Sequence, residues 1–160
     1  MTMKDRVEKA VELFKSGYNC SQSVVAAFAD MYGFTQEQAL RMSASFGGGI
    51  GRMRQTCGAA CGMFLLAGLE KGAVDGKDRE GKAANYALVQ QLAEEFRKRN
   101  GSMICAELLG LKKPEGSSTP SPHGAVLRQA SLRQMVEEAA AIWAEYLENS
   151  GNRQIVPFSG

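Results

Sequence analysis

The stretch TCGAACGMFLLAGLEK, residues 56–71, decides the architecture of this chain. On a helix of 3.6 residues per turn its apolar side chains point in nearly every direction, so no face is left for water. These side chains belong to Ala59, Ala60, Met63, Phe64, Leu65, Leu66 and Leu69. A helix of this kind must be covered by other elements. We therefore expect residues 56–71 to form the central helix of the fold.

Amphipathic segments with helical periodicity flank the central stretch, and no segment alternates with period two. Thr35 and Gln38 form a capping box at the start of one of these segments. The predicted inward stripes are Val7, Ala10, Val11 and Phe14; Val24, Phe28 and Met31; Ala39, Met42 and Phe46; Ala84, Leu88, Leu92 and Phe96; and Leu132, Met135, Ala139, Ile142 and Tyr146. The sequence predicts an all-α fold, a compact bundle of about six or seven helices around a central apolar helix.

Glycines and polar residues set the expected helix boundaries. The first segment ends at Gly17, and the second runs from near Asn19 and Cys20 to Gly33. A long helix covers 77–99 and ends before Gly101. Ser102 caps a short helix through Leu109, and the last strong helix covers 131–147. We expect the two acids of the turn before the long helix, Asp75 and Asp78, to cap or solvate that turn.

The 160 residues fit a single helical domain, residues 1–160, with a core of its own. Residues 112–124, KKPEGSSTPSPHG, contain three prolines, so we expect a mobile surface loop there. The only histidine, His123, lies in this loop and is expected to face solvent. The tail 150–160 looks irregular, and packing of the tail against a neighbouring subunit leaves a homo-oligomer open.

Charge and length exclude some partners. Nineteen Lys and Arg against seventeen Asp and Glu give a formal charge of +2, which favours neither nucleic acid nor an anionic membrane as partner. The start, MTMKDRVEKAVELF, is unlike a secretory signal, and no apolar run is long enough to cross a bilayer. We expect a cytoplasmic protein. Thiols stay reduced there, so its four cysteines indicate metal binding, catalysis, redox exchange or packing before structural disulfides.

Three of the four cysteines, Cys20, Cys57 and Cys105, lie at or near predicted helix starts. The peptide dipoles at a helix start favour a thiolate. Between Gln38 and Leu69 there is no acidic residue, whereas three arginines lie in that span. We therefore expect a positive local field and a lowered pKa at Cys57.

Cys57 and Cys61 are four residues apart, so on a helix they share a face with Cβ atoms about 5–6 Å apart. A disulfide within this pair would strain a regular helix. The two sulfurs could instead bind one metal ion or cluster, or one could attack while the other stays behind. The metal ligands would be Cys20, Cys57, Cys61 and Cys105. Plain packing of small apolar side chains is the alternative for all four.

A glycine-rich loop, GGGIGRMR at residues 47–54, precedes the central helix. Backbone N–H groups of such a loop can converge on an anion, and arginines add charge-assisted hydrogen bonds. The candidate cofactor-binding residues are Gly49, Gly51, Arg52, Arg54 and Gly58. The loop matches neither the dinucleotide fingerprint nor the P-loop, so a tight turn that brings backbone close to another helix is the alternative.

Three blocks, GYNCSQSV, GGGIGRMRQTCGA and NGSMICAELLG, resemble a family of candidate redox-active bacterial proteins with a C-G-A-x-x-C motif and flanking cysteines. The resemblance implies a small, mainly helical iron–sulfur or dithiol redox protein, and it carries over Cys20, Cys57, Gly58, Ala59 and Cys105. The chain departs from the pattern twice. Gly62 stands where we expect a second motif cysteine, with Cys61 one residue earlier, and Arg133 stands near the place of a further cysteine.

Our leading hypothesis is a thiol-based redox or cluster-binding protein in which the other three cysteines gather around Cys57. Either the cysteinates hold an iron–sulfur centre, or Cys57 attacks a disulfide and a neighbour such as Cys61 resolves the product. The redox partner protein is not indicated. The alternatives are a helical binding or assembly module with core cysteines, and a structural zinc site.

Overall fold

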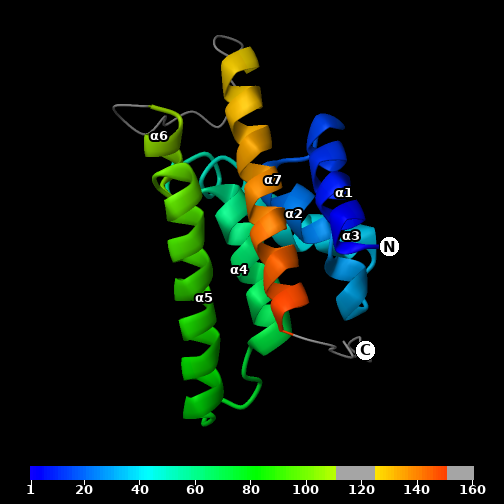
Figure 1. The fold of residues 1–160 in the computed structure, drawn as a ribbon, viewed down its shortest axis with the longest axis vertical. Helices are drawn as coiled ribbons and strands as arrows, with labels where there is room; N and C mark the ends of the chain where they lie inside the picture. Colours follow the sequence, from blue (N-terminus) through cyan, green and yellow to red (C-terminus); the bar gives the residue numbers. More distant parts are fainter. Residues whose placement is uncertain (111–124, 151–160) are drawn as a thin grey trace.

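The computed structural model of the chain describes residues 1–110 and 125–150, and it is all-α (Figure 1). The α-helices are α1 (Met3–Lys15), α2 (Cys20–Ala26), α3 (Gln36–Ser43), α4 (Gly58–Lys71), α5 (Arg79–Asn100), α6 (Cys105–Leu108) and α7 (Ala125–Asn149). Two 3₁₀ turns, η1 (Ala29–Tyr32) and η2 (Ala44–Phe46), follow α2 and α3. The predicted loop at 112–124 and nearly all of the predicted tail lie outside the described residues.

Helix α4 is the central element, as predicted. It contacts α2, α5 and α7, and in Figure 1 it lies behind α7 and beside the long α5. Ala59, Ala60, Met63 and Leu66 are fully buried in the main core, whereas Phe64 and its neighbour Leu65 are only partly buried. The apolar sequence of α4 therefore predicts its place in the fold. Leu65 packs against a second cluster that contains Val25 and Ala39, and Phe64 faces α5 at a pocket lined by Val89 and Ala93.

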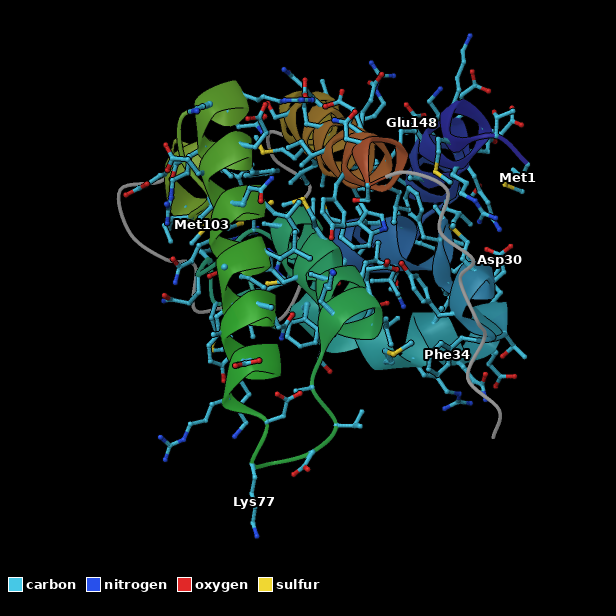
Figure 2. The ribbon with its side chains drawn as sticks, turned by 60° about the horizontal axis from the view of Figure 1, so that its bottom comes forward. Met1, Asp30, Phe34, Lys77, Met103 and Glu148 are labelled. Carbon is cyan, nitrogen blue, oxygen red and sulfur yellow. The ribbon has the colours of Figure 1, made fainter. Side chains whose placement is uncertain are left out.

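Two predicted stripes are wrong in part. The second segment is not one helix, because α2 ends at Ala26 and a 3₁₀ turn carries the chain on to Gly33, whose φ is +82°. In α5, Leu88, Leu92 and Phe96 are buried as expected, but Ala84 is exposed. The reason is geometric: the first turns of α5 extend past the helices that would cover them, and the preceding turn projects with Lys77 at its tip (Figure 2).

The predicted helix starts hold where the signal is local. Thr35 and Gln38 form the expected capping box of α3, and Asp78 accepts the Gly81 N–H at the start of α5. Ser102 does not cap α6, because the helix begins at Cys105; its hydroxyl accepts the Ile104 N–H and donates to Glu107 instead. Helix α7 begins at residue 125, before the predicted 131.

Buried and half-buried ion pairs tie the helices together. The guanidinium of Arg6 on α1 donates to both carboxylate oxygens of Asp30 and to the Ala27 carbonyl. Arg99 on α5 donates to Glu95 on its own helix and to Glu138 and Glu145 on α7. In the part of the chain that the structure describes, no helix is sufficiently long and apolar to span a membrane.

Candidate thiol site

The expected position of cysteines at helix starts is observed for three of them. Cys20 is the first residue of α2, Cys57 is the N-cap of α4, and Cys105 is the first residue of α6. Cys61 lies one turn inside α4. All four are free thiols with buried side chains.

A short antiparallel bridge between Thr56 and Ile104 joins the starts of α4 and α6. The Cys57 N–H donates to the Met103 carbonyl at 2.7 Å, and the Cys105 N–H donates to the Gln55 carbonyl at 2.6 Å. In such a ladder alternate side chains share a face, so Cys57 and Cys105 lie on the same side, opposite to Thr56 and Ile104. The sequence reasoning missed this bridge; a β-branched residue directly before each of the two cysteines was its signal.

The glycine-rich loop turns back on itself in a left-handed conformation. Residues 48–52 all have positive φ, between +58° and +74°, and Arg54 follows at +60°. Ile50 and Arg52 adopt this conformation despite having side chains, at a cost of about 1 kcal/mol each. This turn connects η2 to the strand residues before α4, which form the bridge with Ile104 beside α6.

Two glycines of the site allow close approach to cysteines. A Cβ on Gly49 would lie 2.6 Å from the Cys105 Cβ, and one on Gly58 would lie 2.8 Å from the Phe46 carbonyl oxygen and 3.4 Å from the Cys20 Cβ. Any larger residue at 49 or 58 would displace these neighbours. The alternative interpretation of the loop, a tight turn with close backbone packing, is therefore what the structure supports.

The loop uses most of its own backbone donors. The N–H groups of residues 50–55 all donate to backbone carbonyls between residues 45 and 50. A nest of free amides for an anion therefore does not form from the amides of Gly51, Arg52 and Arg54. Arg54 contributes through its side chain instead.

Arg54 brings positive charge to the sulfur atoms. Its side chain is buried, and its Nη1 lies 3.6 Å from the Cys105 Sγ, to which it donates. Its carbonyl accepts the Ala106 N–H, so its backbone also holds the start of α6. Burial raises the pKa of Cys20 well above its ordinary value, and Arg54 opposes this shift.

Burial dominates the acidity of the thiols. It raises the pKa of Cys57 to about 11, although the Ala60 and Ala59 N–H groups lower it. Burial and then Cys57 raise the pKa of Cys61 to about 11. The lowered pKa expected for Cys57 is therefore wrong, because removing a thiolate from water costs more than two helix-start amides recover.

The four sulfurs form one electrostatic network with Cys57 as its hub. A charge on Cys57 raises the pKa of Cys20 and of Cys61, and a charge on Cys105 raises the pKa of Cys57 and of Cys20. Cys61 belongs less closely to the group, since its thiol is oriented toward the Thr56 carbonyl, 3.9 Å away.

No ligand set for a metal is formed in the described part of the chain, residues 1–110 and 125–150, since no three His, Cys, Asp or Glu side chains are placed to hold an ion. Sulfur is a suitable donor for zinc or an iron–sulfur cluster. The iron–sulfur and zinc assignments stay predictions from the sequence, and we derive no step through a metal.

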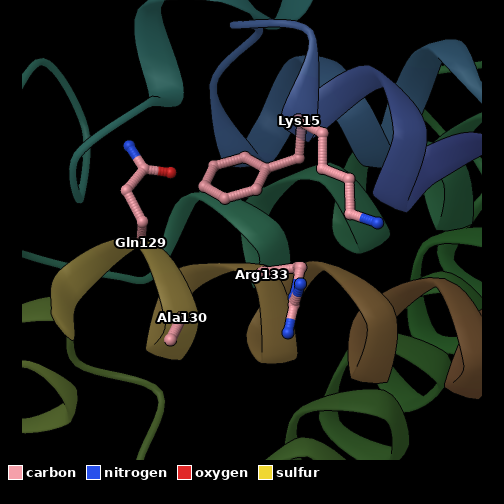
Figure 3. A pocket seen from close by; sticks show the side chains of 5 residues that line it. Lys15, Gln129, Ala130 and Arg133 are labelled. Carbon is pink, nitrogen blue, oxygen red and sulfur yellow. The ribbon is translucent and has the colours of Figure 1, made fainter. Parts of the chain in front are cut away.

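Arg133, near the place where a further cysteine is expected from the resemblance, lines a pocket of about 370 Å³. Figure 3 shows Lys15 of α1 and Arg133 of α7 on opposite sides of this pocket. Phe14, Gln129 and Ala130 complete its lining, so no cysteine contributes to it.

Residues 18–146 match the model of a family described as "Putative redox-active protein (C_GCAxxG_C_C)". No curated protein and no solved structure matches the chain. The central motif in that description ends in glycine, as CGAACG at residues 57–62 does, although its first two letters stand in reverse order. The expected cysteine at 62 is therefore wrong: Gly62 fits the motif, and Cys61 occupies a position that the motif leaves free. The description has two later cysteines, and this chain has only Cys105.

Proposed function

Because the chain belongs to the C_GCAxxG_C_C family of putative redox-active proteins, we propose that it is a thiol-based redox protein that cycles between a dithiol and a disulfide. The observation that carries this proposal is the position of Cys57. The Thr56–Ile104 bridge places Cys57 on one face with Cys105, although the two cysteines are 48 positions apart, and Cys61 follows one turn later in α4.

The chemistry is a two-electron exchange. Two thiols of the network lose two electrons and two protons and form one S–S bond, and a disulfide or other two-electron acceptor takes the electrons. Reduction by a dithiol donor reverses the step. In a reducing cytoplasm the resting form is the dithiol, which agrees with the four free thiols of the structure.

Burial of the thiols slows their reaction with oxidants. With a pKa of about 11, Cys57 is almost wholly protonated at neutral pH, and thiolate is the reactive form. Such a thiol is therefore oxidised slowly at neutral pH. Burial of both sulfurs slows exchange with bulky disulfides, so access to the thiols decides which oxidant reacts.

The test is a redox titration of the full chain, purified without oxygen, in buffers of reduced and oxidised glutathione. We expect two thiols to disappear reversibly, with a mass decrease of two hydrogens and no bound glutathione at equilibrium. The Cys57→Ser variant should lose this transition, because serine is a good N-cap and preserves α4 while removing the sulfur.

Two results would refute the proposal. One is a wild-type protein that keeps four thiols in every buffer, and the other is a Cys57→Ser variant that titrates like the wild type. Metal analysis of the same sample is the companion measurement. Stoichiometric iron with sulfide, or stoichiometric zinc, would replace the dithiol couple by a metal centre.

A further inference from the structure

The bridge between Thr56 and Ile104 selects one pair within the thiol network. Cys57 and Cys105 lie diagonally across it on one face. Diagonal neighbours of an antiparallel pair lie about 7–8 Å apart. A disulfide needs Cα atoms roughly 4.4–6.8 Å apart, so a shift of about 1–2 Å at two helix ends closes the bond.

The other two thiols are less suitable partners for Cys57. Cys61 shares a helix face with it, and its S–H is oriented toward the Thr56 carbonyl rather than toward another sulfur. Cys20 packs against Gly58 at the start of α2, a helix locked by the capping box of Asn19 and Gln22. Moving Cys20 would disturb that cap. Ile104, the N-cap of α6, makes no side-chain capping bond, and the start of α6 is held by backbone hydrogen bonds to Gln55 and Arg54, in the same strand that carries Cys57.

Arg54 distinguishes the two members of the pair. Its Nη1 contacts the Cys105 Sγ at 3.6 Å, and no such cation contacts the Cys57 sulfur among the described interactions. A buried guanidinium stabilises negative charge on the sulfur that it touches. Cys105 is therefore the sulfur that attacks, and Cys57 is the one that completes the disulfide.

The enclosure of the pair limits the oxidant. Cys57 and Cys105 are 2% and 3% exposed, and Gly49 of the loop packs directly on the Cys105 Cβ. Attack on a disulfide requires three sulfurs in line with substituents on both sides. A hydroperoxide presents a single terminal oxygen, about the size of a water molecule, and needs far less room.

Building on the proposed dithiol function, we propose that Cys105 and Cys57 are the reacting pair and that their oxidant is a low-molecular-weight hydroperoxide. The Cys105 thiolate attacks the terminal peroxide oxygen, the O–O bond breaks, and the alkoxide or hydroxide leaves and takes a proton. The Cys57 thiol then attacks the sulfenic sulfur and releases water. Two thiols and ROOH give one disulfide, ROH and H₂O.

The experiment uses hydrogen peroxide on the reduced full chain, with dimedone to trap sulfenic acid and peptide mass mapping to locate the products. In wild type we expect a Cys57–Cys105 disulfide. In Cys57→Ser we expect dimedone on Cys105, at a yield at least about tenfold above that on Cys57 in Cys105→Ser, since only Cys105 has a charge-assisted contact. Cys61→Ser is the matched control and should form the same disulfide as wild type.

The outcomes separate this inference from the proposed function. A disulfide that joins Cys57 to Cys20 or Cys61 overturns the pairing while the dithiol function stands. Stronger trapping on Cys57 than on Cys105 reverses the order of attack and overturns the role of Arg54. Oxidation by glutathione disulfide with none by peroxide overturns the oxidant class. Absence of any disulfide with either reagent removes the proposed function as well.

Discussion

Gly62 tests whether close packing of α2 on α4 explains the glycine that ends the central motif. A Cβ at this position would lie 3.0 Å from the Val24 Cβ, 3.1 Å from the Ser21 carbonyl oxygen and 3.3 Å from the Val24 Cγ1. Val24 is fully buried, and the carbonyl belongs to the backbone of α2, so neither neighbour moves freely. The Gly62→Ala substitution should therefore push α2 away from α4.

Two opposing effects set the magnitude. Alanine in place of glycine inside a helix stabilises it by about 1 kcal/mol. Overpacking of a dense core by one methyl group costs about 1–3 kcal/mol. The free energy of unfolding of Gly62→Ala should thus be unchanged or lower by up to about 2 kcal/mol.

Gly68 provides the matched control, because it lies in the same helix and a Cβ there meets nothing within 4 Å. Gly68→Ala should keep only the helix gain and stabilise the protein by about 1 kcal/mol. The assay is urea unfolding of both variants under reducing conditions. The two variants should differ by about 1–3 kcal/mol, the overpacking cost alone. If Gly62→Ala proves as stabilising as Gly68→Ala, the packing argument fails.

Three further tests concern charged groups and thiols. Hydrogen bonds from Arg6 lower the pKa of Asp30, so its carboxylate stabilises the fold above about pH 4 and this contribution is lost on acidification. Asp30→Asn should therefore reduce the fall in unfolding free energy at acid pH. The change should be at most about 1 kcal/mol, because the carboxylate is half exposed. The raised pKa values of Cys57 and Cys61 predict that the free energy of unfolding falls as pH rises above about 9. They also predict that the alkylation rate of both thiols in the folded state increases about tenfold per pH unit from about pH 7 to 10. A pH-independent alkylation rate would contradict this. Arg99→Gln should lower the free energy of unfolding in urea by about 1–2 kcal/mol, because three carboxylates lose their partner. The control Arg97→Gln removes one contact at 3.7 Å and should lower it by less than about 0.5 kcal/mol. Equal losses in the two variants would refute the role of the Arg99 ion pairs.

The parts of the fold that sequence reasoning predicted are those with local causes. The apolar surround of α4 follows from its own residues, and the caps at Thr35 and Asp78 involve partners three residues away. The break after Ala26 had no local signal, because neither glycine nor proline marks it and the residues on both sides are apolar and buried. Tertiary packing decided that boundary.

The candidate site divides along the same line. The sequence indicated that Cys20, Cys57 and Cys105 begin helices, which is a local property. It gave no measure of burial, and burial reverses the expected direction of the pKa shift at Cys57. The bridge between Thr56 and Ile104 spans 48 positions of the chain, so no short pattern could indicate which cysteines it brings to one face.

Because of that bridge, the alkylation of Cys105 can report the order of events in folding. Helices α4 and α5 form a sequential pair, but Cys105 becomes shielded only when the segment after α5 docks on the loop beside Arg54. Pulses of an alkylating reagent during refolding would therefore record when the docking occurs, separately from the growth of helix seen by circular dichroism. Protection of Cys105 that lags behind helix formation would place this contact among the last steps in assembly.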